Sequence, residues 1–416
     1  MSHHTLYRLQ KVFTAFHPLV VSLFIGTALS RIATSMTVPF FTIYLTAHTE
    51  ASPLQIGVTV GAASIAGMIF GLAGGALSDR WGRRRLMMIS LLMWSGVFLL
   101  FPFTQSFWGL LLLSALNGLC KAGFEPASAA LISDLTPAGL RYRAYSYRYT
   151  AANIGVSVGP VLGALIGFSG GSSAFVLTGI SYLLYLAVLL LLFRSYPFPE
   201  SIQGTGNPAK SDQITLSLAW KAVLRDRRLL WFLAGGALMQ FAYAQMPTLS
   251  PYVSEQFENG VFLFAWLMTT NAVTVTCCQL PVSAFLEKRS PLFAIALGNS
   301  LYALGGLGFI LAGNSWTMIS AMVVFSLGEV FSFPSGSILM DRIAPPRLKG
   351  AYMGAQQLRE LGRFLGPVLG LPLLMRYGIG PVFFLVGLVC CFSTVCYFIG
   401  GRCKPIRDHS GGKIAL

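Results

Sequence analysis

The sequence predicts an all-α membrane protein in which twelve transmembrane helices form two pseudo-symmetric halves of six helices each. Three observations lead to this prediction: apolar stretches of spanning length, the sidedness of the positive charges, and a repeat that relates the halves. Of the 416 residues, 55% are apolar and only 10% are Asp, Glu, Lys or Arg. Because soluble domains carry about 25% charged residues, this composition excludes an ordinary soluble protein. The net charge of +15 is then better explained by membrane topology than by nucleic-acid binding.

Twelve apolar stretches are each long enough to cross a bilayer as a helix, which takes about 20 residues. The predicted spans, in chain order, are 17–46, 54–78, 86–105, 107–134, 144–168, 173–193, 229–252, 260–286, 291–312, 315–341, 350–376 and 379–400. The long polar break at 195–228 divides them six and six, and its part at 214–228 could lie as an amphipathic helix on the inner surface. The expected domains are therefore an N-terminal half (1–194), a cytoplasmic linker (195–228), and a C-terminal half with a cytoplasmic tail (229–416).

The Lys and Arg residues gather on one side of the predicted membrane. Under this span map most of the 29 Lys and Arg fall in the termini and the even-numbered loops, whereas Arg376, at the end of the eleventh span, is the one assigned to an odd-numbered loop. Loops rich in Lys and Arg stay on the cytoplasmic side. Both termini are therefore predicted to be cytoplasmic, in a bacterial-type inner membrane, and no removed signal peptide is indicated.

A sequence repeat supports the division into halves. The string GPVLG at 159–163 recurs at 366–370, an offset of 207 residues. The same offset pairs Asp134 with Asp341 and Tyr145 with Tyr352. Several matches in one register indicate two parallel halves, and transporters of that kind place the substrate site near the bilayer midplane between the halves.

A basic loop follows the second span, with the sequence GALSDRWGRRR at 75–85. It resembles the loop signature G-x-L-x-D-R-x-G-R-[KR]-x of the major facilitator superfamily, and the resemblance implies the twelve-span major facilitator fold. It also implies that an acid in this loop latches the cytoplasmic side together with charges at the ends of the fourth and fifth spans. The residues assigned to this gating motif are Gly75, Asp79, Arg80, Gly82, Arg83, Asp134 and Arg143. The alternative for the arginines is that they only determine topology.

The fifth span carries a stretch of small residues at 155–164 that resembles the motif G-x-x-x-G-P-x-x-G-G of exporters that exchange substrate for protons. Ala164 replaces the final Gly of that motif. Small residues at this spacing let helices approach closely, and Pro bends a helix. Helix packing is therefore the physical role expected of the motif and its repeat, which comprise Gly155, Gly159, Pro160, Gly163, Gly366 and Pro367.

Ionisable residues inside the spans are expensive and usually line a cavity or relay protons. The three deep carboxylates, Glu125, Glu329 and Glu360, are therefore predicted to couple protons. Lys121 can pair with Glu125, and Arg363 with Glu360, because residues three or four apart share a helix face. A structural ion pair is the alternative role for both acids.

Glu329 ranks first among these acids because no basic residue lies within four positions of it along its helix. It lies ~20 Å along its span from the outer end, near the middle, at 1.5 Å per residue. The sequence G-E-x-x-x-x-P at 328–334 resembles the tenth helix of the drug–proton antiporter branch of the superfamily. In that branch the Glu titrates protons or binds cations.

Basic residues outnumber acidic ones five to three inside the predicted spans, which mildly favours a substrate with anionic groups. Their pairing within the protein is the alternative. The residues predicted to line the substrate cavity are Arg31, Lys121, Arg148, Asn153, Arg359 and Arg363. Many drug–proton antiporters carry an Arg in the middle of the fourth helix, and this sequence departs from them there, with Lys121 one turn further along.

The resemblance implies proton-coupled export of small amphipathic molecules by alternating access, as in multidrug efflux. Three alternatives stay open: an exporter of one anionic metabolite such as a siderophore or a glycolipid, an importer or facilitator, and a non-transporting membrane receptor or enzyme. The expected partners are a small-molecule substrate, protons and the lipid bilayer, and we expect a monomer. No enzyme activity, nucleic-acid partner, metal or cofactor beyond the proton gradient is expected, because no P-loop, zinc-ligand spacing or Ser–His–acid set occurs.

Overall fold

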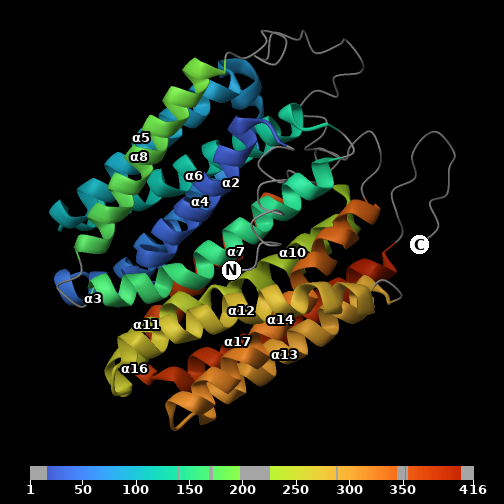
Figure 1. The fold of residues 1–416 in the computed structure, drawn as a ribbon. Helices are drawn as coiled ribbons and strands as arrows, with labels where there is room; N and C mark the ends of the chain where they lie inside the picture. Colours follow the sequence, from blue (N-terminus) through green and yellow to red (C-terminus); the bar gives the residue numbers. More distant parts are fainter. Residues whose placement is uncertain are drawn as a thin grey trace, which may run out of the picture. The chain divides into compact units, whose positions relative to one another are not determined.

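A computed structural model describes residues 16–137, 140–167, 172–196, 225–286, 289–343, 352 and 355–403. Every regular element in these ranges is helical, as predicted (Figure 1). The chain divides into two compact units. Unit 1 comprises Met1–Val38 and Ile69–Ala209, and unit 2 comprises Pro39–Met68 and Lys210–Leu416.

The helices of unit 1 follow the predicted spans closely. They are α2 (Pro18–Thr37), the second part of α4 (Pro53–Trp81), α5 (Arg83–Leu100), the short η2 (Phe101–Phe103), α6 (Phe107–Leu135), α7 (Arg141–Gly167) and α8 (Ser173–Ser195). The short η1 (Val38–Phe40) lies where the chain passes from unit 1 to unit 2.

Unit 2 contains the remaining helices. They are α3 (Phe41–His48), the first part of α4, α10 (Arg227–Tyr243), α11 (Gln245–Gln256), α12 (Gly260–Leu286), α13 (Pro291–Leu311), α14 (Ser315–Ile343), η6 (Gln356–Arg359), α16 (Glu360–Tyr377) and α17 (Ile379–Arg402). Eleven helical segments in the described part of the chain are long and apolar enough to cross a membrane. α16 is the remaining predicted span, and its 18 residues include three charged ones.

Two predicted spans are interrupted rather than continuous. The first, expected at 17–46, breaks into α2, η1 and α3 around Pro39. The seventh, expected at 229–252, breaks at Ala244 between α10 and α11. A proline lacks the N–H donor and clashes with the carbonyl four residues earlier, and Pro247 stands four residues after Tyr243, where α10 ends.

The same helix pairs pack in both units. In unit 1 these are α2 with α7, α2 with α8, α5 with α6, and α5 with α8; in unit 2 they are α10 with α16, α10 with α17, α13 with α14, and α13 with α17. When the helices are numbered from one to six within each half, the packed pairs are the same in both units. They are the first with the fifth, the first with the sixth, the third with the fourth, and the third with the sixth. The repeat seen in the sequence is therefore a repeat of helix packing.

The contact between the first and fifth helices depends on matching glycines. A β-carbon at Gly155 of α7 would collide with the Ala28 carbonyl of α2, and one at Gly362 of α16 would collide with the Ala237 carbonyl of α10. Ala28 and Ala237 lie at the same position counted from the N-cap residues of α2 and α10. Small residues at these positions let the helix backbones touch.

The linker predicted at 195–228, with its amphipathic helix, falls almost wholly outside the described residues. The boundaries predicted for the two halves on either side of it stay predictions.

Candidate functional site

The basic loop after α4 turns sharply at a glycine. Gly82 separates α4 from α5 and has a φ of +83°, a left-handed conformation that side chains other than glycine rarely adopt. Arg83 at the start of α5 forms an ion pair with Asp134 near the end of α6, so two of the predicted gating residues meet. The surroundings of Gly75 and the side chains of Asp79, Arg80 and Arg143 lie outside what the structure describes.

Unit 1 contains a polar cluster built from three helices. Arg31 Nη2 of α2 lies 2.5 Å from Glu125 Oε1 of α6, and both side chains are 34% exposed. Arg148 Nη2 of α7 donates to the Glu125 carbonyl at 3.3 Å and to Ser128 Oγ at 3.1 Å. One ion pair of Glu125 thus comes from another helix, which spacing along α6 does not predict. The side chain of Lys121 of α6 is exposed, and its pairing with Glu125 stays a prediction.

Aromatic side chains of α8 border this cluster. Tyr182 accepts a hydrogen bond from Ser30 Oγ at 3.1 Å and stacks on Trp94, with ring centroids 4.5 Å apart. Trp94 Nε1 in turn donates to Asn117 Oδ1 at 2.6 Å. The hydroxyl of Tyr185 is buried and has no hydrogen-bond partner among the described residues.

Asn153, predicted to line the substrate cavity, bonds within its own helix. Its Nδ2 donates to the Tyr149 carbonyl at 3.1 Å, one turn earlier in α7. This bond holds the amide along the surface of α7, and the part of Asn153 in substrate binding stays a prediction.

In unit 2, Glu329 is bonded to an amide. Asn271 Nδ2 of α12 donates to Glu329 Oε2 at 2.9 Å and to Ser326 Oγ at 3.0 Å. Asn271 is buried, and Glu329 of α14 is half-buried. The sequence analysis missed Asn271, because a search for charged residues passes over a neutral amide and because α12 is a different helix.

Arg363 of α16 has three partners in unit 2. Its Nη1 lies 3.4 Å from Glu360 Oε2, the ion pair that their spacing predicts. Its Nη2 donates to Gln240 Oε1 at 3.1 Å, and its guanidinium lies 5.4 Å from the centre of the Tyr243 ring.

Arg359 lies at the junction of η6 and α16. Its guanidinium donates to the side chain of Gln356 one turn earlier. Its aliphatic stem lies against Gly236 of α10, where a β-carbon would collide with it, and its Nη1 lies near Gly336 of α14. Glycines on both neighbouring helices therefore make room for this arginine.

A buried polar group that the sequence analysis missed lies at the start of α10. Asp226 caps the helix by accepting from the Arg228 and Leu229 amides at 2.9 and 3.2 Å, and it accepts from Tyr352 Oη at 2.5 Å. Asp226, Arg228 and Tyr352 are 4%, 5% and 1% exposed, so this group stabilises unit 2 from within. Asp followed by helix-forming residues is a capping signal, and it could have been found.

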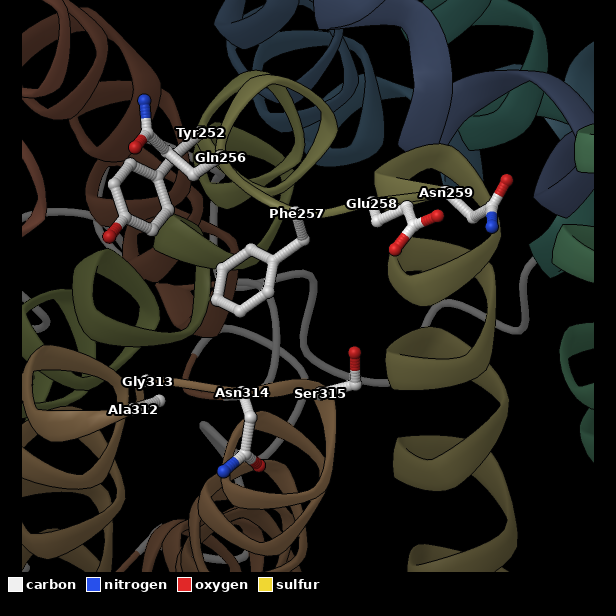
Figure 2. Close-up of a pocket in the computed structure, with 9 residues that line it drawn as sticks. All are labelled: Tyr252, Gln256, Phe257, Glu258, Asn259, Ala312, Gly313, Asn314 and Ser315. Atoms are coloured by element: carbon white, nitrogen blue, oxygen red, sulfur yellow. The ribbon is translucent and has the colours of Figure 1, made fainter.

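A pocket of about 560 Å³ lies at one end of unit 2, between the α11–α12 and α13–α14 turns. Figure 2 shows Tyr252, Gln256 and Phe257 on one side of it and Ala312–Ser315 on the other. Glu258 and Asn259 complete the lining, and none of the predicted site residues takes part. The pocket is separate from the polar groups around Glu329 and Arg363.

Comparison with known proteins gives the family. Residues 23–367 and 246–413 match the model of the Major Facilitator Superfamily. The chain belongs to this superfamily. It is 35% identical to the MFS-type transporter YqjV of Bacillus subtilis (strain 168), over 88% of this chain and 89% of that protein.

Two further relatives of this superfamily transporter are described by activity. One is a Na(+), Li(+), K(+)/H(+) antiporter of Planococcus maritimus, 24% identical over 87% of this chain and 91% of that protein. The other is the multidrug resistance protein MdtH of Aeromonas hydrophila, 25% identical over 76% of each chain. Among solved structures, the nucleoside transporter NupG matches with a TM-score of 0.72 at 15% identity, covering 92% of this chain and 98% of that chain, which shows the fold alone.

The predicted major facilitator fold is therefore confirmed, and the protein is a multi-pass membrane transporter of a family that moves small molecules rather than an enzyme. Its bacterial relatives are consistent with an inner-membrane location. Chemically, unit 1 places an arginine on the carboxylate of Glu125, whereas unit 2 places a neutral amide on the carboxylate of Glu329.

Proposed function

We propose that this transporter is a proton-coupled antiporter that exports small amphipathic molecules, with Glu329 as the residue that carries the proton. The observation that supports this role is the hydrogen bond from Asn271 to Glu329. An amide N–H can donate to a carboxylate and to the carbonyl oxygen of a carboxylic acid alike. Glu329 can therefore take up and release a proton while it keeps this partner.

The other two deep acids have arginine partners, so protonation would disrupt an ion pair. Glu125 pairs with Arg31, and Glu360 pairs with Arg363. This difference ranks Glu125 and Glu360 behind Glu329 as proton sites.

In the proposed cycle, Glu329 takes a proton from outside the cell and releases it inside as the site alternates between the two sides of the membrane. Substrate moves in the opposite direction. The names of two relatives, a multidrug resistance protein and a cation/proton antiporter, are in keeping with antiport.

The test is proton flux in everted membrane vesicles with a pH-sensitive dye. Amphipathic cations and anions are added in turn to vesicles with the wild type, Glu329→Gln or Glu258→Gln. Glu258 is an exposed acid at the α11–α12 turn and is the matched control. We expect substrate-dependent proton release with the wild type and Glu258→Gln, and none with Glu329→Gln at equal expression. Unchanged coupling in Glu329→Gln removes this residue from the mechanism.

Monovalent cation/proton antiport is a second candidate. The side chains of Glu329, Asn271 and Ser326 bring oxygen atoms together inside unit 2, and the Planococcus maritimus relative is described as exchanging Na(+), Li(+) and K(+) for protons. The same vesicles test it with sodium and potassium salts. A proton response to these salts alone, lost in Asn271→Leu, supports this candidate over export of organic molecules.

A further inference from the structure

The helix interiors of unit 1 carry a surplus of positive charge. Away from the helix ends, the described helices of this unit contain the cations Arg31, Lys121 and Arg148 but a single carboxylate, Glu125. Whatever their mutual contacts, three positive charges and one negative charge leave a surplus of two. Surplus charge at this depth in a membrane is expensive and marks a functional site.

Geometry brings two of these three cations together at Glu125. Arg31 and Arg148 approach Glu125 from different helices, one at its carboxylate and the other at its backbone carbonyl. The Arg31 side chain stays 34% exposed in spite of its ion pair. Arginine presents several N–H donors in a planar fork that suits carboxylate and phosphate groups.

A buried hydroxyl beside the cluster gives a second, independent indication. Tyr185 is 5% exposed, and its hydroxyl has no hydrogen-bond partner among the described residues. Its ring packs against that of Phe124, with centroids 5.9 Å apart, and Phe124 directly precedes Glu125 in α6. A buried donor without a partner is costly, about 1–3 kcal/mol, and an anionic oxygen bound at Arg148 would provide that partner.

We propose that Arg31, Arg148 and Tyr185 of unit 1 bind an anionic group of the substrate, so that the exported molecules are amphipathic organic anions. This inference rests on the transport function proposed above and names its substrate class. Binding of the anion involves unit 1, whereas proton carriage by Glu329 involves unit 2.

The test is binding to the purified full-length protein in detergent, measured as the shift of its thermal unfolding midpoint. Three probes share one apolar body: phenylbutyrate is an anion, phenylbutanamide is neutral, and phenylbutylamine is a cation. We expect stabilisation by phenylbutyrate alone. Stabilisation by phenylbutylamine in preference, or by none of the three, overturns the proposal.

Variants locate the site. Losing a hydrogen bond to a charged group weakens binding about tenfold or more, so we expect this loss in Arg148→Gln and a smaller one in Arg148→Lys, which keeps the charge. Tyr185→Phe should also weaken phenylbutyrate binding without lowering the unfolding midpoint of the free protein, because the hydroxyl makes no hydrogen bond to the described residues. Arg289→Gln, at an exposed arginine of unit 2, is the matched control. Wild-type affinity in both Arg148→Gln and Tyr185→Phe overturns the proposal.

The outcomes separate this inference from the proposed function. Glu329→Gln should bind phenylbutyrate as the wild type does, because its substitution lies in unit 2. Anion binding without proton flux in vesicles contradicts the antiport mechanism but supports the anion site of unit 1. Proton flux with cationic substrates, together with no anion binding, supports antiport but contradicts the anion site of unit 1.

Discussion

Unit 1 and unit 2 share an arrangement of helices but differ in the chemistry of their interiors. Counted from the N-cap residues His17 and Asp226, Arg31 of α2 and Gln240 of α10 occupy the same position. Arg31 supplies a cation to an acid on the fourth helix of its unit, whereas Gln240 supplies a neutral oxygen to Arg363 on the fifth. The first helix thus keeps its packing role and changes its charge.

The fourth helices show the same reversal. Both α6 and α14 contain an interior proline, Pro126 and Pro334. In the register of the half repeat, an offset of 207 residues, Lys121 of unit 1 falls on Gly328, the residue before Glu329 of unit 2. With two arginines, at 359 and 363, against the two acids at 329 and 360, the interior charges of unit 2 balance, whereas those of unit 1 do not. The comparison suggests that one duplicated scaffold separates the substrate anion from the proton.

Exchanging the two acids for amides tests this separation and should give the largest effect. Glu329→Gln should abolish coupled proton flux, because a glutamine amide cannot take up and release a proton as a carboxyl group does. Glu125→Gln should keep coupling and bind phenylbutyrate more tightly, because it removes the negative charge beside Arg31 and Arg148. Dye-monitored flux in vesicles and thermal shifts measure the two effects. If Glu125→Gln stops coupling while Glu329→Gln does not, the roles of the units are reversed.

Enlarging the matched glycines tests the shared packing. Gly155→Leu and Gly362→Leu should each lower the free energy of unfolding by about 1–3 kcal/mol, the usual cost of overpacking, because a β-carbon at either site meets backbone. The controls are Gly96→Leu in α5 and Gly387→Leu in α17, where a β-carbon meets nothing within 4 Å. Thermal unfolding in detergent measures all four. A loss at only one of the two sites would mean that the halves do not pack alike.

Removing the arginine of the unit 1 cluster is expected to cost less. Arg31→Gln leaves Glu125 without its ion pair, and because both side chains are 34% exposed we expect a loss of only about 1 kcal/mol. The double variant Arg31→Gln with Glu125→Gln should recover most of it, since neither member of the ion pair is then left charged without the other. Absence of recovery shows that Arg31 stabilises unit 1 through packing instead.

The sequence predicts features that lie along a single helix, and it misses the side-chain contacts between two helices. The apolar spans, the half repeat and the Glu360–Arg363 pair follow from length, offset and spacing along a single helix. The bonds from Arg31 to Glu125 and from Asn271 to Glu329 depend on how one helix is rotated and shifted against another. That register is set by packing contacts such as those of Gly155 and Gly362, which a count of charges does not contain.

The smallest single effect is expected for His17→Ala, in a comparison of the caps of the two first helices. Asp226 accepts two backbone amides of α10 and the Tyr352 hydroxyl, so Asp226→Ala should cost about 1–2 kcal/mol. His17 Nδ1 accepts a hydrogen bond from the Leu19 amide at 3.2 Å. His17→Ala should lower the free energy of unfolding by ~0.5 kcal/mol or less. Tyr352→Phe should lower the free energy of unfolding by about 1.5 kcal/mol, more than His17→Ala, because it removes one hydrogen bond to a charged acceptor. Thermal unfolding of the three variants orders them, and a His17→Ala effect as large as that of Asp226→Ala would show that the first helices are anchored alike despite their different caps.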